Sequence, residues 1–367
     1  MNEMEERADE RLLSLDFYRG LTMFLLIAEF SGLFSLLVSP QFEGTIIYFI
    51  GTQLQHVKWE GLHFWDLIQP FFMFIVGVAM PLSFSKRIAK GDSYGQITTH
   101  VLKRAFIMLL LGWALYCIEP GKIVFRFQNV LAQLSIAYLL AFLVMRKSLS
   151  IQIGFSVLLI LISEALYRFF PLDGFNNAFV PGESFGAWLN ILISGENGGG
   201  NWAMFNAIPT AAHTIWGLMA GQLLMGKSSA KIKLWVLFGA GIIGLAIGYG
   251  FSPITPIIKR IATSTFVFAS GGWALIALAV CYWLIDMKKY QKGVLFFAIV
   301  GMNPLFIYLF AHVGGAKLIN KILLSFSNTL FGWTGELGSQ IILSSIVVFM
   351  LWYICYWMYK RKIFIRI

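Results

Sequence analysis

Ten apolar runs, each close to the roughly 20 residues that a helix needs to cross about 30 Å of hydrocarbon, most constrain what this chain can fold into. Length indicates helices here, because buried strands rarely exceed about eight residues. We therefore predict an all-α, polytopic membrane protein whose helices pack around a central cavity or tunnel. The predicted spans lie at about 20–39, 62–85, 102–118, 128–145, 151–170, 206–225, 232–251, 264–285, 294–312 and 338–358.

The basic residues indicate how these spans are oriented, because cytoplasmic loops are enriched in Lys and Arg. With the N-terminus inside, the inner segments hold 20 of the 28 Lys and Arg residues and the outer segments hold eight. This bias predicts ten spans with both termini in the cytoplasm. We expect a single membrane domain, 1–367, with a cytoplasmic N-terminal segment at 1–19, an extracytoplasmic loop at 171–205 and a basic cytoplasmic tail at 359–367.

Composition excludes a soluble protein and a nucleic-acid partner. The chain is 58% hydrophobic and 13% charged, with a mean hydropathy of +0.74, so it has too few polar residues to cover a soluble domain. Its net charge of +10 is divided into small clusters between apolar runs instead of forming a contiguous basic surface. The three cysteines lie inside apolar runs without metal-like spacing, and no metal site is predicted.

Titratable residues inside apolar runs are candidates for function, because each costs at least about 2.5–3.5 kcal/mol on insertion scales. Glu29 lies midway along the first run with no cationic neighbour within one helical turn, so we expect it to face a polar cavity. Glu164 and Arg168 are four residues apart and are interpreted as an ion pair on one helix. His213 and His312 are interpreted as hydrogen-bonded packing residues.

The stretch QHVKWEGLHFWDL (55–67), which leads into the second apolar run, brings several titratable groups to the predicted outer edge of the membrane. A histidine in an aqueous loop is unremarkable by itself. His56, however, is followed by Trp59 and by Asp66, so that an imidazole, a carboxylate and Glu29 are predicted to converge on the outer side.

Two loops are candidate ligand sites. The outer loop 171–205 contains no Lys or Arg and carries acids, asparagines, Trp188 and Trp202, which suits a cationic sugar; a solvated cap with a short interfacial helix explains it equally well. The inner loop that leads to Lys103 and Arg104 suits a polyanion such as a nucleotide cofactor, although topology alone also accounts for its charge.

Two segments resemble a known family. RLLSLDFYRG (11–20) and HVKWEGLHFWDLIQPFFMFIVGVAMPLS (56–83) are similar to the opening of the heparan-α-glucosaminide N-acetyltransferase family and its bacterial NagX-like relatives. Weaker similarities follow in the expected order in QNVLAQLSIAYLLAF, IPTAAHTIWGLMAGQLL, TSTFVFASGGWALIALAVCYWLID and GMNPLFIYLFAH. The resemblance therefore covers nearly the whole chain.

The resemblance implies a membrane enzyme that moves acetyl from cytoplasmic acetyl-CoA to the amine of a glucosamine-type sugar at the extracytoplasmic side. With its bacterial relatives in mind, we expect the enzyme in a bacterial inner membrane. The family's histidine falls on His56, which is predicted to act as acetyl acceptor or general base, with Asp66 orienting its ring. Lysosomal members carry an asparagine near the outer part of the first family helix. Here the nearest polar residue is Glu29, one position away, and we expect it to recognise the ammonium group of the hexosamine.

The remaining predicted contacts concern the two substrates and the membrane. We expect the phosphates of CoA to contact Arg19, Lys103 and Arg104, since phosphate recognition favours paired basic groups. The acceptor is expected to contact Trp59, Trp188, Trp202 and Asn303. The bilayer is the third partner, and the small faces Gly217–Gly221 and Gly244–Gly248 allow close helix contacts and are compatible with a homodimer.

Two alternatives stay open at this point. His56, Glu29 and Asp66 would also suit a proton-coupled gate in an amino-sugar transporter, with Pro70 and Pro81 as helix breaks. The same acyl-transfer chemistry would also serve an O-acetyltransferase of envelope glycans.

Overall fold

The computed structural model describes residues 12–118 and 120–365, which form helices, turns and loops, with no strand among them. Most of the predicted N-terminal segment 1–19 lies outside the described residues. The chain divides into two compact units. The first contains Val57–Leu62 and Gln69–Lys288, and the second contains Leu13–His56, His63–Ile68 and the chain after Lys288.

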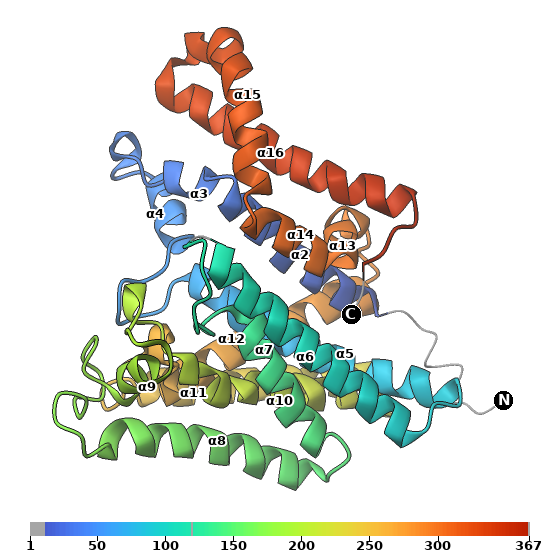
Figure 1. The fold of residues 1–367 in the computed structure, drawn as a ribbon. Coiled ribbons are helices and arrows are strands. Elements are labelled where there is room, and N and C mark those ends of the chain that lie inside the picture. The colour runs from blue at the N-terminus through green and yellow to red at the C-terminus, as the bar shows by residue number, and fades with distance from the viewer. Residues whose placement is uncertain (1–11, 119, 366–367) are drawn as a thin grey trace. The chain divides into compact units, whose positions relative to one another are not determined.

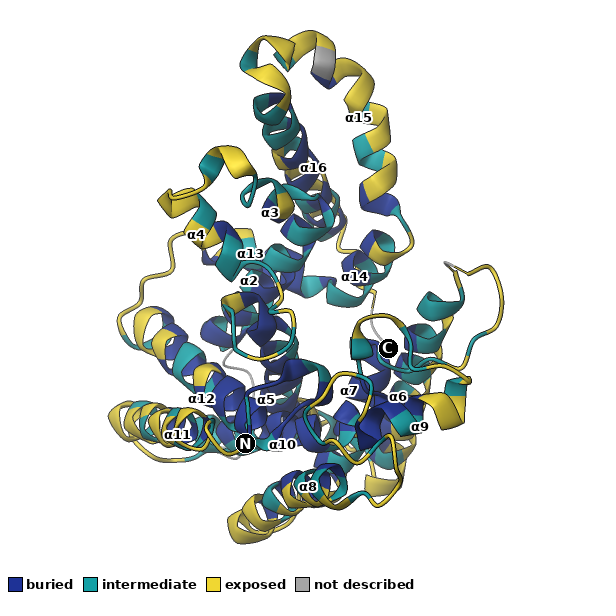
Figure 2. Ribbon diagram, turned by 90° about the vertical axis from the view of Figure 1, so that its left-hand side faces the viewer, coloured by how far each residue is buried: buried dark blue, intermediate teal, exposed yellow. Residues whose placement is uncertain are grey.

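The first unit is a bundle of helices (Figure 1), in which α10 and α12 are largely buried. Its helices are α5 (Ile68–Ala89), α6 (Tyr94–Ile118), α7 (Val130–Val144), α8 (Leu149–Phe169), α9 (Phe185–Ser194), α10 (Ala207–Met225), α11 (Ala230–Gly250) and α12 (Ser264–Cys281), which continues as a π-helical turn at Tyr282–Met287. The helix α10 contacts α7, α8 and α12, and α11 packs along α12. In Figure 2, α8 and α11 are exposed along one side, and the residues there are mostly apolar, as expected for surfaces that face lipid.

Glycine brings the helices of this bundle close together. A Cβ atom on Gly217 or Gly221 would stand 2.1 or 2.4 Å from the carbonyl oxygens of Phe74 and Val78 on α5. The second glycine face of α11 likewise meets α12 without room for a side chain. Both faces predicted to allow close helix contacts are therefore confirmed.

The second unit is built on α2, which packs along α13, and ends in a helical hairpin (Figure 1). Its helices are α2 (Leu13–Phe30), α3 (Leu33–Leu36), α4 (Ile46–Gln53), α13 (Val294–Met302), α14 (Pro304–His312), α15 (Gly315–Phe331) and α16 (Gly335–Lys360). Short 3₁₀ turns in the chain occupy Pro40–Phe42, Phe64–Leu67, Gly199–Asn201, Met204–Asn206, Lys259–Ile261 and Gly332–Thr334.

Each predicted apolar run coincides with helix, which supports a polytopic membrane protein. Six helices among the described residues are long and apolar enough to cross a membrane, or seven if a bent pair counts as one span. That pair, α13 and α14, bends by 71° at Asn303, because Pro304 supplies no N–H and disfavours helical backbone before it. The number of ten spans and their orientation stay predictions.

Candidate functional site

His56 and Asp66 lie together at the N-terminal end of the second predicted span. His56 follows α4, and Asp66 belongs to the 3₁₀ turn Phe64–Leu67, which leads directly into α5. The Nδ1 atom of His56 is 2.7 Å from Oδ1 of Asp66. The Asp66 side chain is 2% exposed, whereas that of His56 is 36% exposed. The pair therefore joins a buried carboxylate to a ring that solvent and ligands can reach.

The second oxygen of this carboxylate is also held. The backbone N–H of His63 donates to Oδ2 of Asp66 at 3.1 Å, and Nδ1 of His63 lies 3.0 Å from the carbonyl oxygen of Gln55. Both oxygens of Asp66 thus have a partner, which holds the carboxylate in one orientation. Because Oδ1 accepts, we assign the ring proton of neutral His56 to Nδ1, which makes Nε2 the nitrogen that carries the lone pair.

Glu29 reaches the same region from α2. Its Oε1 accepts a hydrogen bond from Nε1 of Trp65 at 2.9 Å. Trp65 is buried, packs edge-on against Phe34 at 5.1 Å, and lies with its ring centroid 6.5 Å from that of His56. The three residues predicted to be catalytic therefore belong to one unit, and Trp65 lies between Glu29 and the His56–Asp66 pair.

This arrangement suits proton transfer or nucleophilic attack by an imidazole. A neutral histidine has one lone-pair nitrogen that takes a proton or an acyl group near pH 7. A carboxylate on the other nitrogen orients the ring and stabilises the positive charge that either step creates.

The predicted acceptor-binding tryptophans lie in the first unit, around the loop 171–205. Trp59 donates from Nε1 to the carbonyl oxygen of Phe179 at 2.7 Å. Trp188 sits on α9, the short helix of this loop, with its ring 4.9 Å from Phe170 and 5.9 Å from Phe185. These two tryptophans thus help to build an aromatic cluster beneath the loop. Their contact with an acceptor stays a prediction.

Basic residues from other loops surround Trp202. The Nζ atom of Lys259 lies 5.7 Å from its ring centroid, and the guanidinium carbon of Arg260 lies 5.3 Å from it. Arg126 forms an ion pair with Glu196 of the same loop. The loop has no Lys or Arg of its own, so its local sequence indicates an acidic surface. The tertiary structure adds cations that the local sequence does not reveal.

Asn303 occupies the break between α13 and α14 and is fully buried. Its Nδ2 donates to the carbonyl oxygen of Ile363 at 3.0 Å, and its Oδ1 accepts from the N–H of Ile365 at 2.9 Å. The amide therefore ties the C-terminal segment to the helix break. A role in binding the acceptor stays a prediction.

The residues expected to bind CoA are divided between the two units. Arg19 lies one turn beyond Asp16 on α2, with Nη1 3.9 Å from Oδ1. Arg104 sits on α6 with its guanidinium carbon 5.0 Å from the ring centroid of Tyr138, and Lys103 beside it is exposed.

Sequence reasoning assigned no role to three residues that shape the site around His56, namely Gln55, His63 and Trp65, although all three fall within or beside the quoted stretch 56–83.

Comparisons with known proteins match this chain to one family. A sequence model described as the catalytic part of heparan-alpha-glucosaminide N-acetyltransferase matches residues 11–250. The heparan-alpha-glucosaminide N-acetyltransferase of Homo sapiens is 23% identical over 431 residues, which cover 97% of this chain and 60% of that protein. The protein of the same name from Mus musculus is 22% identical over 438 residues, which cover 100% of this chain and 62% of that protein. The chain thus spans about 60% of the length of these relatives.

Proposed function

Since the chain belongs to the heparan-alpha-glucosaminide N-acetyltransferase family, we propose that it transfers acetyl from cytoplasmic acetyl-CoA to the amine of a glucosamine-type sugar at the extracytoplasmic side. The observation that carries this proposal is the His56–Asp66 pair, in which a buried and doubly hydrogen-bonded carboxylate orients an accessible imidazole. Acyl transfer to an amine needs such a group, because the amine must lose a proton as it attacks.

In the base route, Nε2 of His56 takes a proton from the acceptor nitrogen while that nitrogen attacks the thioester carbonyl. The new C–N bond forms, the C–S bond breaks, and the imidazolium returns its proton to the CoA thiolate. In the acceptor route, Nε2 attacks the thioester carbonyl first, the C–S bond breaks and the CoA thiolate leaves. The neutral amine then attacks the acetyl-imidazolium, the bond between acetyl and Nε2 breaks, and the amine proton passes to the thiolate. Asp66 stabilises the positively charged ring in both routes.

Glu29 and the basic residues complete the proposal. The Glu29 carboxylate, which also holds Trp65, attracts the ammonium form of the acceptor, which releases one proton to solvent before the neutral amine attacks. Arg19, Lys103 and Arg104 attract the phosphates of CoA from the cytoplasmic side. Trp59, Trp188, Trp202 and Asn303 are the proposed contacts of the acceptor.

The test is acetyl transfer by the purified chain in detergent, with labelled acetyl-CoA and glucosamine. We expect His56→Ala to lower kcat by about 10²- to 10⁴-fold, the contribution of a general base. The matched control is His63→Gln, which removes an imidazole from the same loop but keeps the backbone N–H that holds Asp66. A monodisperse His56→Ala protein with near wild-type turnover would refute the site.

The same assay separates the alternatives. Substrate uptake into proteoliposomes without consumption of acetyl-CoA would indicate a transporter, and an ester in the product, detected by mass spectrometry, would indicate an O-acetyltransferase. Rapid-quench mass spectrometry without acceptor distinguishes the two routes, because only the acceptor route leaves acetyl on His56.

A further inference from the structure

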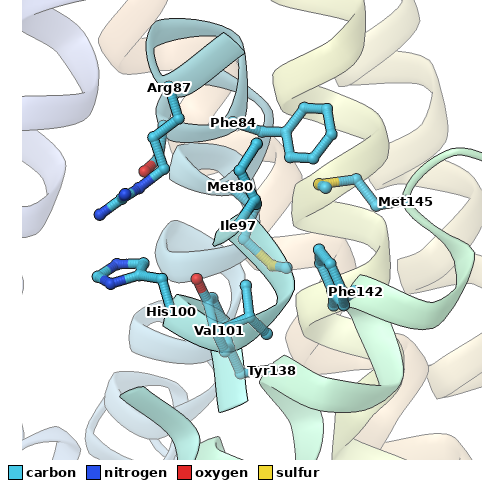
Figure 3. Close-up of a pocket in the computed structure, with 10 residues that line it drawn as sticks. Met80, Phe84, Arg87, Ile97, His100, Val101, Tyr138, Phe142 and Met145 are labelled. Carbon is cyan, nitrogen blue, oxygen red and sulfur yellow. The ribbon is translucent and has the colours of Figure 1, made fainter. Parts of the chain in front are cut away.

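A small hollow lies in the first unit where α5, α6 and α7 meet (Figure 3). Arg87 from α5, His100 from α6 and Tyr138 from α7 form its polar side. In Figure 3, the side chains of Arg87 and His100 extend in the same direction, away from Phe142 and Met145. This is the Lys- and Arg-rich end of these helices, which the charge bias predicts to be cytoplasmic.

Positive charge exceeds negative charge around this polar side. Arg104 stacks on Tyr138, which lines the hollow, and its Nε is buried without a hydrogen-bond partner. The charges of Arg87, Arg104 and Lys103 all act on His100. Among the described residues, the ion pair at this site joins Nη1 of Arg87 to Oδ2 of Asp92 at 3.0 Å. One carboxylate among three permanent cations leaves an excess of charge that an anion would satisfy.

The other side of the hollow is apolar and aromatic. Phe84 and Phe142 line it, and both pack on Tyr94, at ring separations of 6.4 and 5.9 Å. Arg146 lies over the Tyr94 ring at 4.9 Å and adds a further cation at the edge of this side. A ligand that fits both sides has an anionic group joined to a chain that tolerates apolar contact.

We propose that this hollow binds the phosphate ester end of an amphiphilic ligand. The phosphate lies against Arg87, His100 and Arg104, and the attached chain runs over Phe84 and Phe142. Arginine suits this role because its planar guanidinium pairs with two phosphate oxygens at once. The hollow itself has room for about one water molecule, so the phosphate and the start of its chain lie over its opening rather than inside it.

Two molecules at a cytoplasmic membrane face carry this chemistry, acetyl-CoA and an anionic phospholipid. The acetyl-CoA source rests on the proposed function, whereas the phospholipid source does not. If acetyl-CoA is the ligand, Arg87 and His100 join Lys103 and Arg104 as contacts of the acetyl donor. If an anionic phospholipid is the ligand, the hollow is a lipid site.

The experiment compares two double variants of the full chain. Arg87→Gln with Arg104→Gln removes two cations from the hollow, whereas Lys86→Gln with Lys90→Gln removes two exposed cations from the same end of α5 that do not line it. Acetyl-CoA binding is measured by isothermal titration calorimetry in detergent. Retention of phosphatidylglycerol, against phosphatidylcholine, is measured by native mass spectrometry from nanodiscs. Size exclusion monitors folding, and Arg104→Lys is the milder variant, which keeps the charge and loses the planar fork.

If acetyl-CoA is the ligand, the hollow variant raises its Kd by about tenfold or more, the range of a lost charge-assisted contact, and the control stays within about twofold. If phospholipid is the ligand, the hollow variant loses bound phosphatidylglycerol and the Kd of acetyl-CoA is unchanged. Equal binding of both molecules by hollow variant, control and wild type would overturn the proposal. Acetyl transfer by the wild-type chain distinguishes a failure of the proposed function from a failure of this proposal. If the wild-type chain transfers no acetyl, the proposed function is refuted, and the retention of phosphatidylglycerol still shows whether the hollow binds a phospholipid.

Discussion

Glu164 and Asp66 lie at the ends of apolar helical segments, and their carboxylates are held in different ways. In the first unit, Oε1 of Glu164 contacts Nε of Arg168 at 2.5 Å and the hydroxyl of Thr255 at 2.9 Å, while Oε2 accepts from Ser264 at 2.8 Å. In the second unit, Asp66 has its partners in the ring of His56 and in a backbone N–H.

The difference lies in what the partner offers to a ligand. Arg168 also donates to Thr255 and to the carbonyl oxygen of Ile254, so the Glu164 network links α8 to the loop that precedes α12. His56 has an accessible ring instead, and in the proposed mechanism its Nε2 is the nitrogen that reacts. We infer that a saturated network stabilises the fold, whereas a carboxylate that orients a titratable ring indicates chemistry.

The largest expected effect is that of Asp66→Asn. The amide keeps the shape of the side chain but loses the charge that orients and stabilises the imidazolium, so kcat should fall by about 10²- to 10⁴-fold. The acetyl-transfer assay in detergent measures it, with Asp173→Asn in the exposed outer loop as a control of equal charge change. A wild-type rate in the Asp66 variant would contradict the distinction between a carboxylate that orients a reactive ring and one that only links two segments of the fold.

Next in size is the pair Glu29→Gln and Glu29→Ala. Glutamine keeps an oxygen that accepts from Trp65 and removes the charge, so we expect the KM for glucosamine to rise about tenfold with little change in kcat. Alanine also frees the Trp65 N–H, so its kcat should fall as well. If the glutamine variant keeps the wild-type KM and only alanine is impaired, Glu29 positions Trp65 and does not bind the amine.

Glu164→Gln tests whether the Glu164 network only stabilises the fold. The variant leaves Arg168 with weaker partners, and we expect a loss of about 1–3 kcal/mol in stability with unchanged kcat and KM for the folded fraction. Thermal unfolding in detergent, followed by intrinsic fluorescence, gives the shift relative to Glu60→Gln, which removes an exposed carboxylate. Loss of turnover without loss of stability would assign chemistry to this network.

The smallest expected effect is that of Trp59→Phe. The substitution keeps an aromatic ring in the cluster beneath the outer loop and removes the hydrogen bond to Phe179. One neutral hydrogen bond contributes about 0.5–1.5 kcal/mol, so the KM for the acceptor should change by about tenfold at most. Steady-state kinetics with varied glucosamine measures it, and a large fall in kcat would place Trp59 at the reaction instead.

Much of the fold follows from local patterns. The ten apolar runs coincide with helices, and the Glu164–Arg168 pair forms as the i, i+4 spacing predicts. The first run illustrates where pattern fails: its apolar residues continue to 39, but α2 ends at Phe30, and Gly32 follows with a φ of 82°. Hydropathy measures solvent preference and carries no information about a turn between two apolar segments.

For the outer site, the sequence by itself determined that a histidine and an aspartate ten residues apart belong together at the end of a span, because local chain geometry brings them close. Only the tertiary structure decided which residues surround them and the other candidates. Trp65 meets Glu29 from another helix, cations of distant loops reach Trp202, and α5, α6 and α7 together form the hollow. The physical reason is that such contacts depend on how helices far apart in the chain pack, which the pattern of any single helix does not specify.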